Sequence, residues 1–259
     1  MAKPRISIVI PSYNKAQFIG KTLDSIFGQN YSNLEVIIQD GGSTDGTLDI
    51  IKSFSKKYPI IWESKKDKGQ LDAVNKGLAK ATGNILTFIN ADDVYEDGAF
   101  SEVTKSYQDN PQALWFAEQG KVIDKNGKEI AKPSTWYKNF LLSLNSRFYL
   151  LTTNYLTQPS VFFTKEAYTK YGPFEGTGSG VIMEYGFWLK LSKISMPVVI
   201  GKVLSSFRIT DTNISSVAYK SILKEDELIT KKFTKNKFIL FLHKLNNLGR
   251  VFIIKIINR

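Results

Sequence analysis

The chain has no cysteine and only one histidine among its 259 residues, and both scarcities narrow its chemistry. Without cysteine there is no disulfide, no thiolate metal site and no cysteine nucleophile, which fits a reducing compartment. The single histidine, His243, lies close to the C-terminus among apolar residues, which argues against a Ser-His dyad and a multi-histidine zinc site. A general base in this protein must therefore be a carboxylate, a lysine or a tyrosine.

Long hydrophobic runs are also missing. Near the N-terminus the run 6–10 ends at Pro11, which is too short for a secretory signal or a spanning helix. Near the C-terminus the apolar runs 238–242 and 251–254 are separated by polar residues and Gly249. We therefore expect no export signal and no membrane span, and a cytoplasmic location.

The net charge of +11 is concentrated at one end of the chain. Residues 231–259 contain eight Lys or Arg and no Asp or Glu. This clustering argues against a nucleic-acid-binding surface on the rest of the chain. Two interpretations of the tail stay open: a basic amphipathic helix lying on the anionic inner face of the cell membrane, or a helix packed against its own domain or a partner subunit.

The first 110 residues alternate between apolar β-branched runs and segments of helical periodicity. Strands are predicted at 6–10, 34–39, 60–63 and 85–89, and helices at 17–29, 45–58 and 70–80. Strands joined by such helices form right-handed crossovers, so we expect an α/β fold with a mainly parallel sheet flanked by helices.

The pattern changes after Pro111. We predict a strand at 113–117, a hairpin turn at 124–127, a mixed stretch at 140–155, a strand from Gln158, a flexible loop at 177–180 and a helix at 183–193. The chain then divides into one domain, 1–215, and a C-terminal helical extension, 216–259.

Polar residues follow each of the first four predicted strands. In a parallel sheet these strand ends meet at one edge, where ligands bind. The residues are Pro11, Tyr13 and Asn14; Asp40, Gly42 and Ser43; Lys68, Gly69, Gln70 and Asp72; and Asn90, Ala91, Asp92 and Asp93. The ring of Tyr13 could cover a nucleobase and Asp40 could accept a base N–H, although 41–46 also fits an ordinary tight turn before a helix. Neither a G-x-G-x-x-G fingerprint nor a P-loop is present.

Asp92 and Asp93 are adjacent carboxylates at the end of a buried strand. Two neighbouring negative charges repel each other unless a cation lies beside them, so a divalent metal ion is the natural partner. The pair also fits the acidic first turn of a helix, where carboxylates are favoured. Glu184 begins an apolar helix, and its position alone does not distinguish a functional carboxylate from a solvated one.

Taken in order, these strings resemble the family 2 inverting glycosyltransferases, whose fold is called GT-A, of the non-processive kind that builds bacterial polysaccharides. The resemblance covers about residues 5–215 and rests on the strings 6–14, 39–47, 67–77, 90–93 and 184–189. It implies a nucleotide-binding half, 1–110, and an acceptor-binding half, 111–215. The chain lacks Gln-x-x-Arg-Trp, a signature of processive synthases, so one sugar per encounter is expected.

The resemblance also implies roles for individual residues. Pro11, Tyr13 and Asp40 would hold the base; Asn14, Gly42, Ser43 and the loop Lys68–Asp72 would border the nucleotide sugar; Asn90, Ala91 and Asp92 would lie near the ribose and diphosphate. Asp92 and Asp93 would bind Mn²⁺ or Mg²⁺. Glu184 would be the catalytic base, ionised at neutral pH with an ordinary pKa of about 4.3. Trp136, Gln158 and Arg208 are the candidate acceptor-side residues.

The implied reaction is hexosyl transfer from a nucleotide-diphosphosugar, expected to be a UDP-sugar, to a saccharide or polyprenyl-linked acceptor in cell-surface polysaccharide synthesis. The sequence departs from the common family pattern at Asn90, Val74 and Gly186, where an aspartate, an arginine and an acid are frequent. Two alternatives therefore remain: a noncatalytic nucleotide-binding partner of another transferase, and a nucleotidyltransferase, although the glycine-rich, arginine-containing loop of the latter is missing after the first strand.

Overall fold

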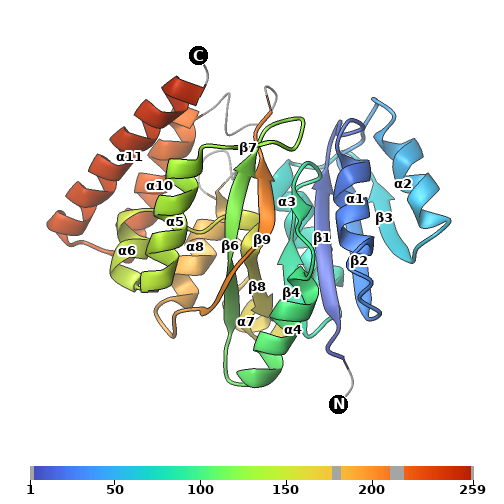
Figure 1. The fold of residues 1–259 in the computed structure, drawn as a ribbon, viewed down its shortest axis with the longest axis horizontal. Coiled ribbons are helices and arrows are strands. Elements are labelled where there is room, and N and C mark those ends of the chain that lie inside the picture. The colour runs from blue at the N-terminus through green and yellow to red at the C-terminus, as the bar shows by residue number, and fades with distance from the viewer. Residues whose placement is uncertain (1–2, 177–181, 211–218, 258–259) are drawn as a thin grey trace.

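The computed structural model describes residues 3–176, 182–210 and 219–257. Within these ranges, nine strands form one sheet with helices packed around it (Figure 1). The strand order is β3-β2-β1-β4-β8-β6-β9-β5, and the short β7 pairs with β6. The predicted loop at 177–180 and the predicted boundary at 215 both lie outside the described residues.

The first half of the sheet is parallel, as the alternation of strands and helices predicted. Its strands are β1 (Ile6–Ser12), β2 (Leu34–Asp40), β3 (Ile60–Ser64) and β4 (Ile85–Phe88), and its helices are α1 (Ile19–Phe27), α2 (Thr47–Ser55) and α3 (Gln70–Lys80). Ser12 pairs with Asp40, and Asp40 pairs with Ser64. This register aligns the carboxyl ends of three strands, so the loops that follow them share one edge.

The second half of the sheet is mixed. Its elements are β5 (Val94–Tyr95), α4 (Ala99–Asp109), β6 (Trp115–Ile123), β7 (Glu129–Ile130), β8 (Val161–Thr164), α7 (Lys165–Tyr171), α8 (Met183–Leu191) and β9 (Val198–Arg208). β8 runs antiparallel to β4 and β6, whereas β9 runs parallel to β6. β6 and β9 therefore run in the same direction as β1 to β4, whereas β8 and the short β5 and β7 run in the opposite direction.

Three segments differ in detail from the sequence prediction. The mixed stretch 140–155 becomes the end of α5 (Lys132–Leu144) and the short α6 (Arg147–Thr152), which Ser146 caps by accepting the amide of Phe148 at 3.3 Å. The strand expected from Gln158 begins instead with a 3₁₀ turn, Gln158–Ser160, before β8. The prediction missed this turn because Gln-Pro-Ser precedes an apolar run without a periodic signal of its own.

Alternate residues of the buried strands supply two hydrophobic clusters, one on each face of the sheet. Val9, Ile37 and Phe88 point to one face, and Ile8, Val36 and Phe116 point to the other. On the first face α3 approaches β1 so closely that a Cβ on Gly77 would lie 2.3 Å from a methyl group of Val9. Only glycine fits there, and this close approach positions the start of α3 near the strand ends.

The C-terminal extension packs against the domain, which is one of the two arrangements that the sequence left open. Its helices, α10 (Tyr219–Phe233) and α11 (Lys237–Ile257), lie beside α6 and α8 (Figure 1). The buried His243 has its Nδ1 3.0 Å from the carbonyl oxygen of Leu151, and Asn246 donates to the carbonyl of Thr152 at 3.2 Å. None of the described helices combines the length and the apolar character that a membrane span requires.

One carboxyl group is buried without a hydrogen-bond partner among the described residues. Glu118, on β6, is almost fully buried, and neither of its carboxyl oxygens has a hydrogen-bond partner among the described residues. Burial, and to a smaller extent the charge of Glu102, raise the pKa of Glu118 well above its ordinary value. The folded protein therefore keeps a proton at Glu118 that the unfolded chain releases at neutral pH, which lowers stability there.

We predict that Glu118→Gln stabilises the protein at neutral pH, by about 1.4 kcal/mol for each unit by which burial raises the pKa. The free energy of unfolding of the wild type should fall as the pH rises above the unfolded-state pKa of about 4.3, and the variant should show a shallower fall. Denaturant titrations across the pH range measure both. The exposed Glu129→Gln is the matched control; equal slopes for the two variants would contradict the prediction.

Candidate functional site

The loops after β1 and β2 are joined by hydrogen bonds. The side-chain oxygen of Asn14 accepts the amide of Thr44 at 2.9 Å, and the hydroxyl of Ser43 accepts the amide of Asn14 at 2.8 Å. Asn14 has a φ of 51°, a conformation that asparagine adopts more readily than most residues. These bonds hold Tyr13 at the tip of its loop, where its side chain is exposed and open to a ligand.

Asp40 is occupied by its own loop. Its Oδ2 accepts the amides of Gly42 and Ser43 at 3.0 and 2.9 Å and the hydroxyl of Ser64 at 2.7 Å, and its Oδ1 accepts the hydroxyl of Ser43. Gly42 has a φ of 88°, which favours glycine. The carboxylate of Asp40 is buried and shapes the loop, and its expected role as an acceptor for a base N–H stays a prediction.

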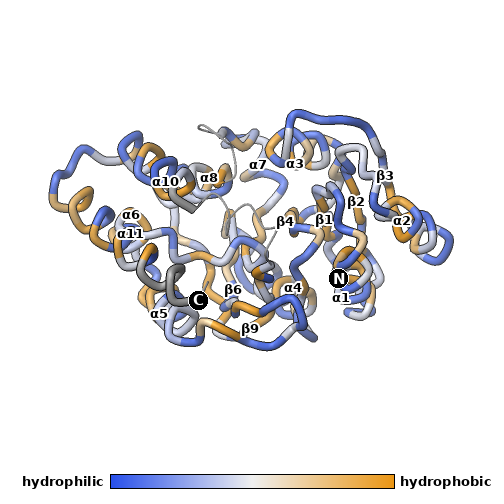
Figure 2. The backbone as a smooth tube through the Cα atoms, turned by 90° about the horizontal axis from the view of Figure 1, so that it is seen from above, coloured by the Kyte–Doolittle hydropathy of each residue, from blue (hydrophilic) through white to orange (hydrophobic). Residues whose placement is uncertain are grey.

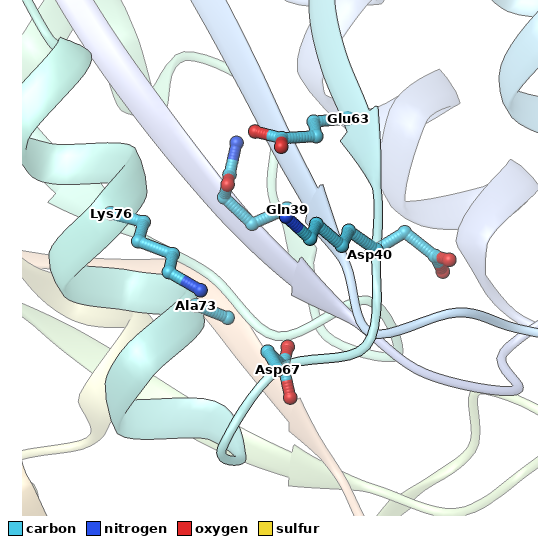
Figure 3. Close-up of a pocket in the computed structure, with 7 residues that line it drawn as sticks. Gln39, Asp40, Glu63, Asp67, Ala73 and Lys76 are labelled. Atoms are coloured by element: carbon cyan, nitrogen blue, oxygen red, sulfur yellow. The ribbon is translucent and has the colours of Figure 1, made fainter.

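A small cavity lies between β2, β3 and α3 (Figure 3). Its lining residues are Gln39, Asp40, Glu63, Lys65, Asp67, Ala73 and Lys76. Lys76 and Asp67 point into the same space, whereas the carboxylate of Asp40 is turned away from Lys76. Its volume of about 20 Å³ is enough for a water molecule.

The loop before α3 is shaped by two aspartates. Gly69 has a φ of 106°, and its amide donates to Asp67 Oδ1 at 2.8 Å. Asp72 Oδ2 accepts the amide of Lys68 at 3.1 Å and the ammonium of Lys76 at 2.7 Å, and this hydrogen bond to Lys76 lowers the pKa of Asp72. The side chain of Lys68 is exposed at the same edge.

Asp92 forms an ion pair with a residue that sequence analysis did not single out. The ammonium nitrogen of Lys15, in the loop after β1, lies 2.5 Å from Asp92 Oδ2. Asp92 is nearly buried, and Lys15 is partly exposed. The ion pair places a positive charge beside the carboxylate for which the sequence predicted a cation.

Asp93 has a different environment from Asp92. It is fully buried, its Oδ1 accepts the backbone amide of Arg208 at 2.8 Å, and its Oδ2 accepts the side-chain amide of Asn90 at 3.1 Å. Burial, followed by the charge of Asp92, raises the pKa of Asp93 well above its ordinary value. Asp93 therefore ties the start of β5 to the end of β9, and its expected role as a metal ligand stays a prediction.

Arg208 completes this junction. Its Nε donates to the carbonyl oxygen of Asp92 at 2.7 Å, and its guanidinium lies 5.4 Å from the ring centre of Phe18 at the start of α1. Arg208 is nearly buried, so its side chain holds the strand ends in place. Arg208, which was predicted on the acceptor side, therefore lies beside the two aspartates and holds them in position.

Asn90 connects three loops through its side-chain amide. Its Oδ1 accepts from Gln70 at 2.6 Å, and its Nδ2 donates to Asp93 and, at 3.4 Å, to Gln158. The amide of Gln158 donates in turn to the carbonyl of Phe88 at 2.6 Å. The departure from the family's aspartate now has a physical reason: a carboxylate at position 90 has no N–H to donate to Asp93 and would repel it.

Glu184 lies at the start of α8 and is largely buried. The pKa of Glu184 is raised to about 7, mainly by burial; the charge of Asp226, on α10, contributes to the increase, and the charge of Lys138, on α5, opposes it. The ordinary pKa expected from the sequence is therefore wrong for this group. The ring of Phe174 lies 4.8 Å from that of Phe187, one turn after Glu184, and 5.6 Å from that of Phe88, so α8 begins near the end of β4.

Most of the predicted residues contact one another where the strands end, but Trp136 lies outside this group of contacts. Trp136 is 68% exposed on α5 and stacks on Phe140, away from Lys138 and therefore away from Glu184. Three residues that bear on the site were missed: Lys15, Lys138 and Asp226. Lys15 follows Tyr13 by two residues and could have been considered, whereas no sequence signal connects Lys138 or Asp226 to Glu184.

A divalent ion would find the carboxylate of Asp92 here, at the strand ends beside Lys15. Within residues 3–176, 182–210 and 219–257 no group of three His, Cys, Asp or Glu side chains is placed to hold a metal ion. Mg²⁺ sites in nucleotide-binding proteins commonly use one or two carboxylates and take their other ligands from substrate phosphates. Asp92, with a positive charge already at 2.5 Å, fits that kind of site.

Solved structures of other proteins share the fold of this chain. A mannosyltransferase from Pyrobaculum calidifontis, in complex with GDP-Man and Mn²⁺, superposes with a TM-score of 0.73 at 18% identity, covering 98% of this chain and 74% of that one. Residues 1–349 of Staphylococcus aureus TarS, in complex with UDP-GlcNAc, give a TM-score of 0.66 at 18% identity, covering 87% of this chain and 66% of that one. The mixed sheet flanked by helices is the GT-A fold.

Sequence comparisons identify the family. An uncharacterized glycosyltransferase of Nostoc sp. is 32% identical over 133 residues, and a PGL/p-HBAD biosynthesis glycosyltransferase of Mycobacterium bovis is 42% identical over 106 residues. These matches cover 51% and 40% of this chain, and 41% of each relative's length. The sequence model of glycosyl transferase family 2 matches residues 7–172, which is more than half of the chain. The protein therefore belongs to glycosyltransferase family 2.

Proposed function

We propose that this protein transfers one sugar from a nucleotide-diphosphosugar to a hydroxyl group of an acceptor, with inversion at the anomeric carbon. The observation that carries the proposal is the ion pair between Asp92 and Lys15, which places a carboxylate and a mobile cation where the strand ends meet. The solved structures that share the fold include complexes with GDP-Man and with UDP-GlcNAc, which supports a nucleotide-sugar donor. Family membership argues against the nucleotidyltransferase alternative.

Asp92 is the residue that would hold Mn²⁺ or Mg²⁺, with Asp93 supporting it from behind. The bound ion would supply positive charge to a diphosphate leaving group. Lys15 would leave Asp92 when the donor arrives, and its ammonium would remain close enough to face a phosphate oxygen, because its backbone amide is fixed by Thr47 at 2.8 Å. Asn90, Gln70 and Gln158 would keep the loops of the site in register.

Glu184 is the proposed general base, which takes the proton of the acceptor hydroxyl as the new glycosidic bond forms. A base works best with a pKa near the operating pH, and the pKa of about 7 for this buried carboxyl meets that condition. Lys138 favours its ionised form, and Asp226 opposes it. Lys138 lies in the acceptor-binding half and Asp226 in the C-terminal extension, so both parts of the chain act on the protonation of the proposed base.

The exposed ring of Tyr13 is the proposed platform for the base of the donor, which we expect to be a UDP-sugar. The proposed acceptor is a saccharide, free or polyprenyl-linked. A thermal-shift screen of uridine, guanosine and thymidine diphosphosugars, with and without Mn²⁺, tests the donor. A bound donor at about 100 times its dissociation constant stabilises by about 2.7 kcal/mol. If no nucleotide sugar changes the melting temperature, the proposal fails.

We predict opposite effects for the two aspartates. Asp92→Asn should keep the wild-type melting temperature but lose the Mn²⁺-dependent stabilisation by the donor, because it removes the charge at the crevice. Asp93→Ala should lower the free energy of unfolding by about 1–3 kcal/mol, because the amides of Arg208 and Asn90 lose their acceptor. Melting curves with and without donor and Mn²⁺ separate the effects. The assignment is wrong if Asp92→Asn still responds to Mn²⁺.

We also predict that Glu184→Gln binds the donor normally and transfers sugar about 10²- to 10⁴-fold more slowly. In the wild type, kcat/KM should fall about tenfold for each pH unit below about 7, because only the ionised carboxylate accepts a proton. The exposed Glu175→Gln is the control. Normal turnover of Glu184→Gln would remove it as the base, and donor binding without any wild-type turnover would favour a noncatalytic partner.

A further inference from the structure

Helices α5 and α11 are neighbours at the end of the molecule farthest from β3 (Figure 2). The hydroxyl of Tyr137, on α5, donates to Asn246 Oδ1, on α11, at 3.1 Å. α6 lies under α11, because His243 and Asn246 contact the carbonyl groups of Leu151 and Thr152. α5 and α11 therefore lie next to each other at this end of the molecule.

The outward face of α11 is apolar. Phe238, Phe241, Leu245 and Leu248 follow one another at spacings of three and four residues, and each is between 55% and 62% exposed. The opposite side of the helix carries His243 and Asn247, which are buried against the domain. The stripe is therefore separate from the contacts that attach α11 to the fold.

A second apolar stripe lies on α5. Trp136, Phe140 and Leu144 recur every four residues, all are exposed, and the rings of Trp136 and Phe140 stack at 5.7 Å. Leu141 and Leu142 face the core instead. The seven residues of the two stripes are here called the α5/α11 apolar face. Single exposed apolar residues are common, but two adjacent stripes that include large aromatic rings indicate a binding surface.

The two segments that carry this face have basic but no acidic residues. Residues 130–165, which include α5 and α6, and residues 231–259, which include α11, contain no Asp or Glu. Lys237 and Lys244 are exposed on α11 beside the apolar stripe, and Lys235 is exposed just before the helix. A surface with aromatic and leucine side chains, lysines and no acid is complementary to phospholipid head groups above an acyl layer.

We propose that the α5/α11 apolar face rests on the surface of an anionic phospholipid bilayer. The aromatic and leucine side chains enter the head-group region, and the lysine ammonium groups lie against lipid phosphates. The buried side of α11 stays attached to α6 and α10, so the whole domain docks with its helices in the membrane plane. This membrane contact is a property separate from the proposed glycosyl transfer, and it can be measured without a donor or an acceptor.

The position of the α5/α11 apolar face would bring the edge of the sheet that carries Asp92 and Asp93 near the lipid. α5 begins at Lys132, directly after β7, and β7 pairs with the end of β6. Ile123, the last residue of β6, pairs with Arg208, the last residue of β9 and a neighbour of Asp92. The N-terminal end of α5, with Trp136, therefore lies at the edge of the sheet that carries the aspartates. An acceptor anchored in the same membrane would be presented at that edge.

Flotation of the full chain with liposomes tests the proposal. We expect binding to vesicles of phosphatidylcholine with phosphatidylglycerol, weaker binding to phosphatidylcholine alone, and a decrease with added salt. Phe241→Ser with Leu245→Ser, and separately Trp136→Ser with Phe140→Ser, should weaken binding about tenfold or more. Lys237→Gln and Lys244→Gln should each weaken binding to the anionic vesicles about fivefold.

Matched controls lie elsewhere on the surface. Ile61→Ser with Ile194→Ser removes exposed apolar groups, and Lys56→Gln with Lys57→Gln removes exposed charges after α2, at the opposite end of the molecule. Both control variants should float as the wild type does. A blue shift of the emission of Trp136 on addition of anionic vesicles, obtained by subtracting the spectrum of Trp136→Phe, reports contact in the fully folded protein.

Three outcomes would overturn the proposal. The first is the absence of wild-type flotation with anionic vesicles. The second is an equal loss of binding in the control variants, which would indicate non-specific adsorption. The third is a stable dimer, detected by light scattering, that Phe241→Ser with Leu245→Ser dissociates without changing flotation, because the face would then bind a second copy of the chain.

Discussion

The site depends on how two adjacent carboxylates are accommodated at the end of one buried strand. Repulsion between Asp92 and Asp93 is relieved by different means on the two sides of the backbone. Asp93 is buried with a raised pKa and accepts two N–H donors, from Arg208 and Asn90, whereas Asp92 forms an ion pair with the ammonium of Lys15. Asp93 thereby ties the strand ends together, and Asp92 holds a lysine at the same place.

Around the rest of this edge, too, some residues hold the loops in shape and others are exposed to a ligand. Asp40 folds its own loop by accepting two backbone amides and two hydroxyls, and Asp72 fixes the loop before α3. Tyr13 and Lys68 remain exposed at the tips of these loops. Acidic side chains in the loops thus act mainly by satisfying backbone donors, which is the work that rigid binding loops require.

The C-terminal helices α10 and α11 contribute to the environment of the proposed base and to the exposed apolar face. Their inner sides carry Asp226, which acts on the pKa of Glu184, and Arg250, which pairs with Asp226. Their outer sides carry the exposed apolar stripe of α11. Binding at the outer face and the protonation of the proposed base therefore both depend on the same few helices.

The sequence by itself determined the parallel strands, the loops at their ends, the aspartate pair and the family, because these depend on short-range periodicity and on motifs a few residues long. The tertiary structure decided which residues these motifs contact. Lys15 reaches Asp92, Arg208 reaches Asp93, and Lys138 and Asp226 approach Glu184 across separations that no local pattern records. Burial, which depends on how all the helices pack, set the pKa of Glu184, and the packing of α11 on α6 left its apolar stripe exposed.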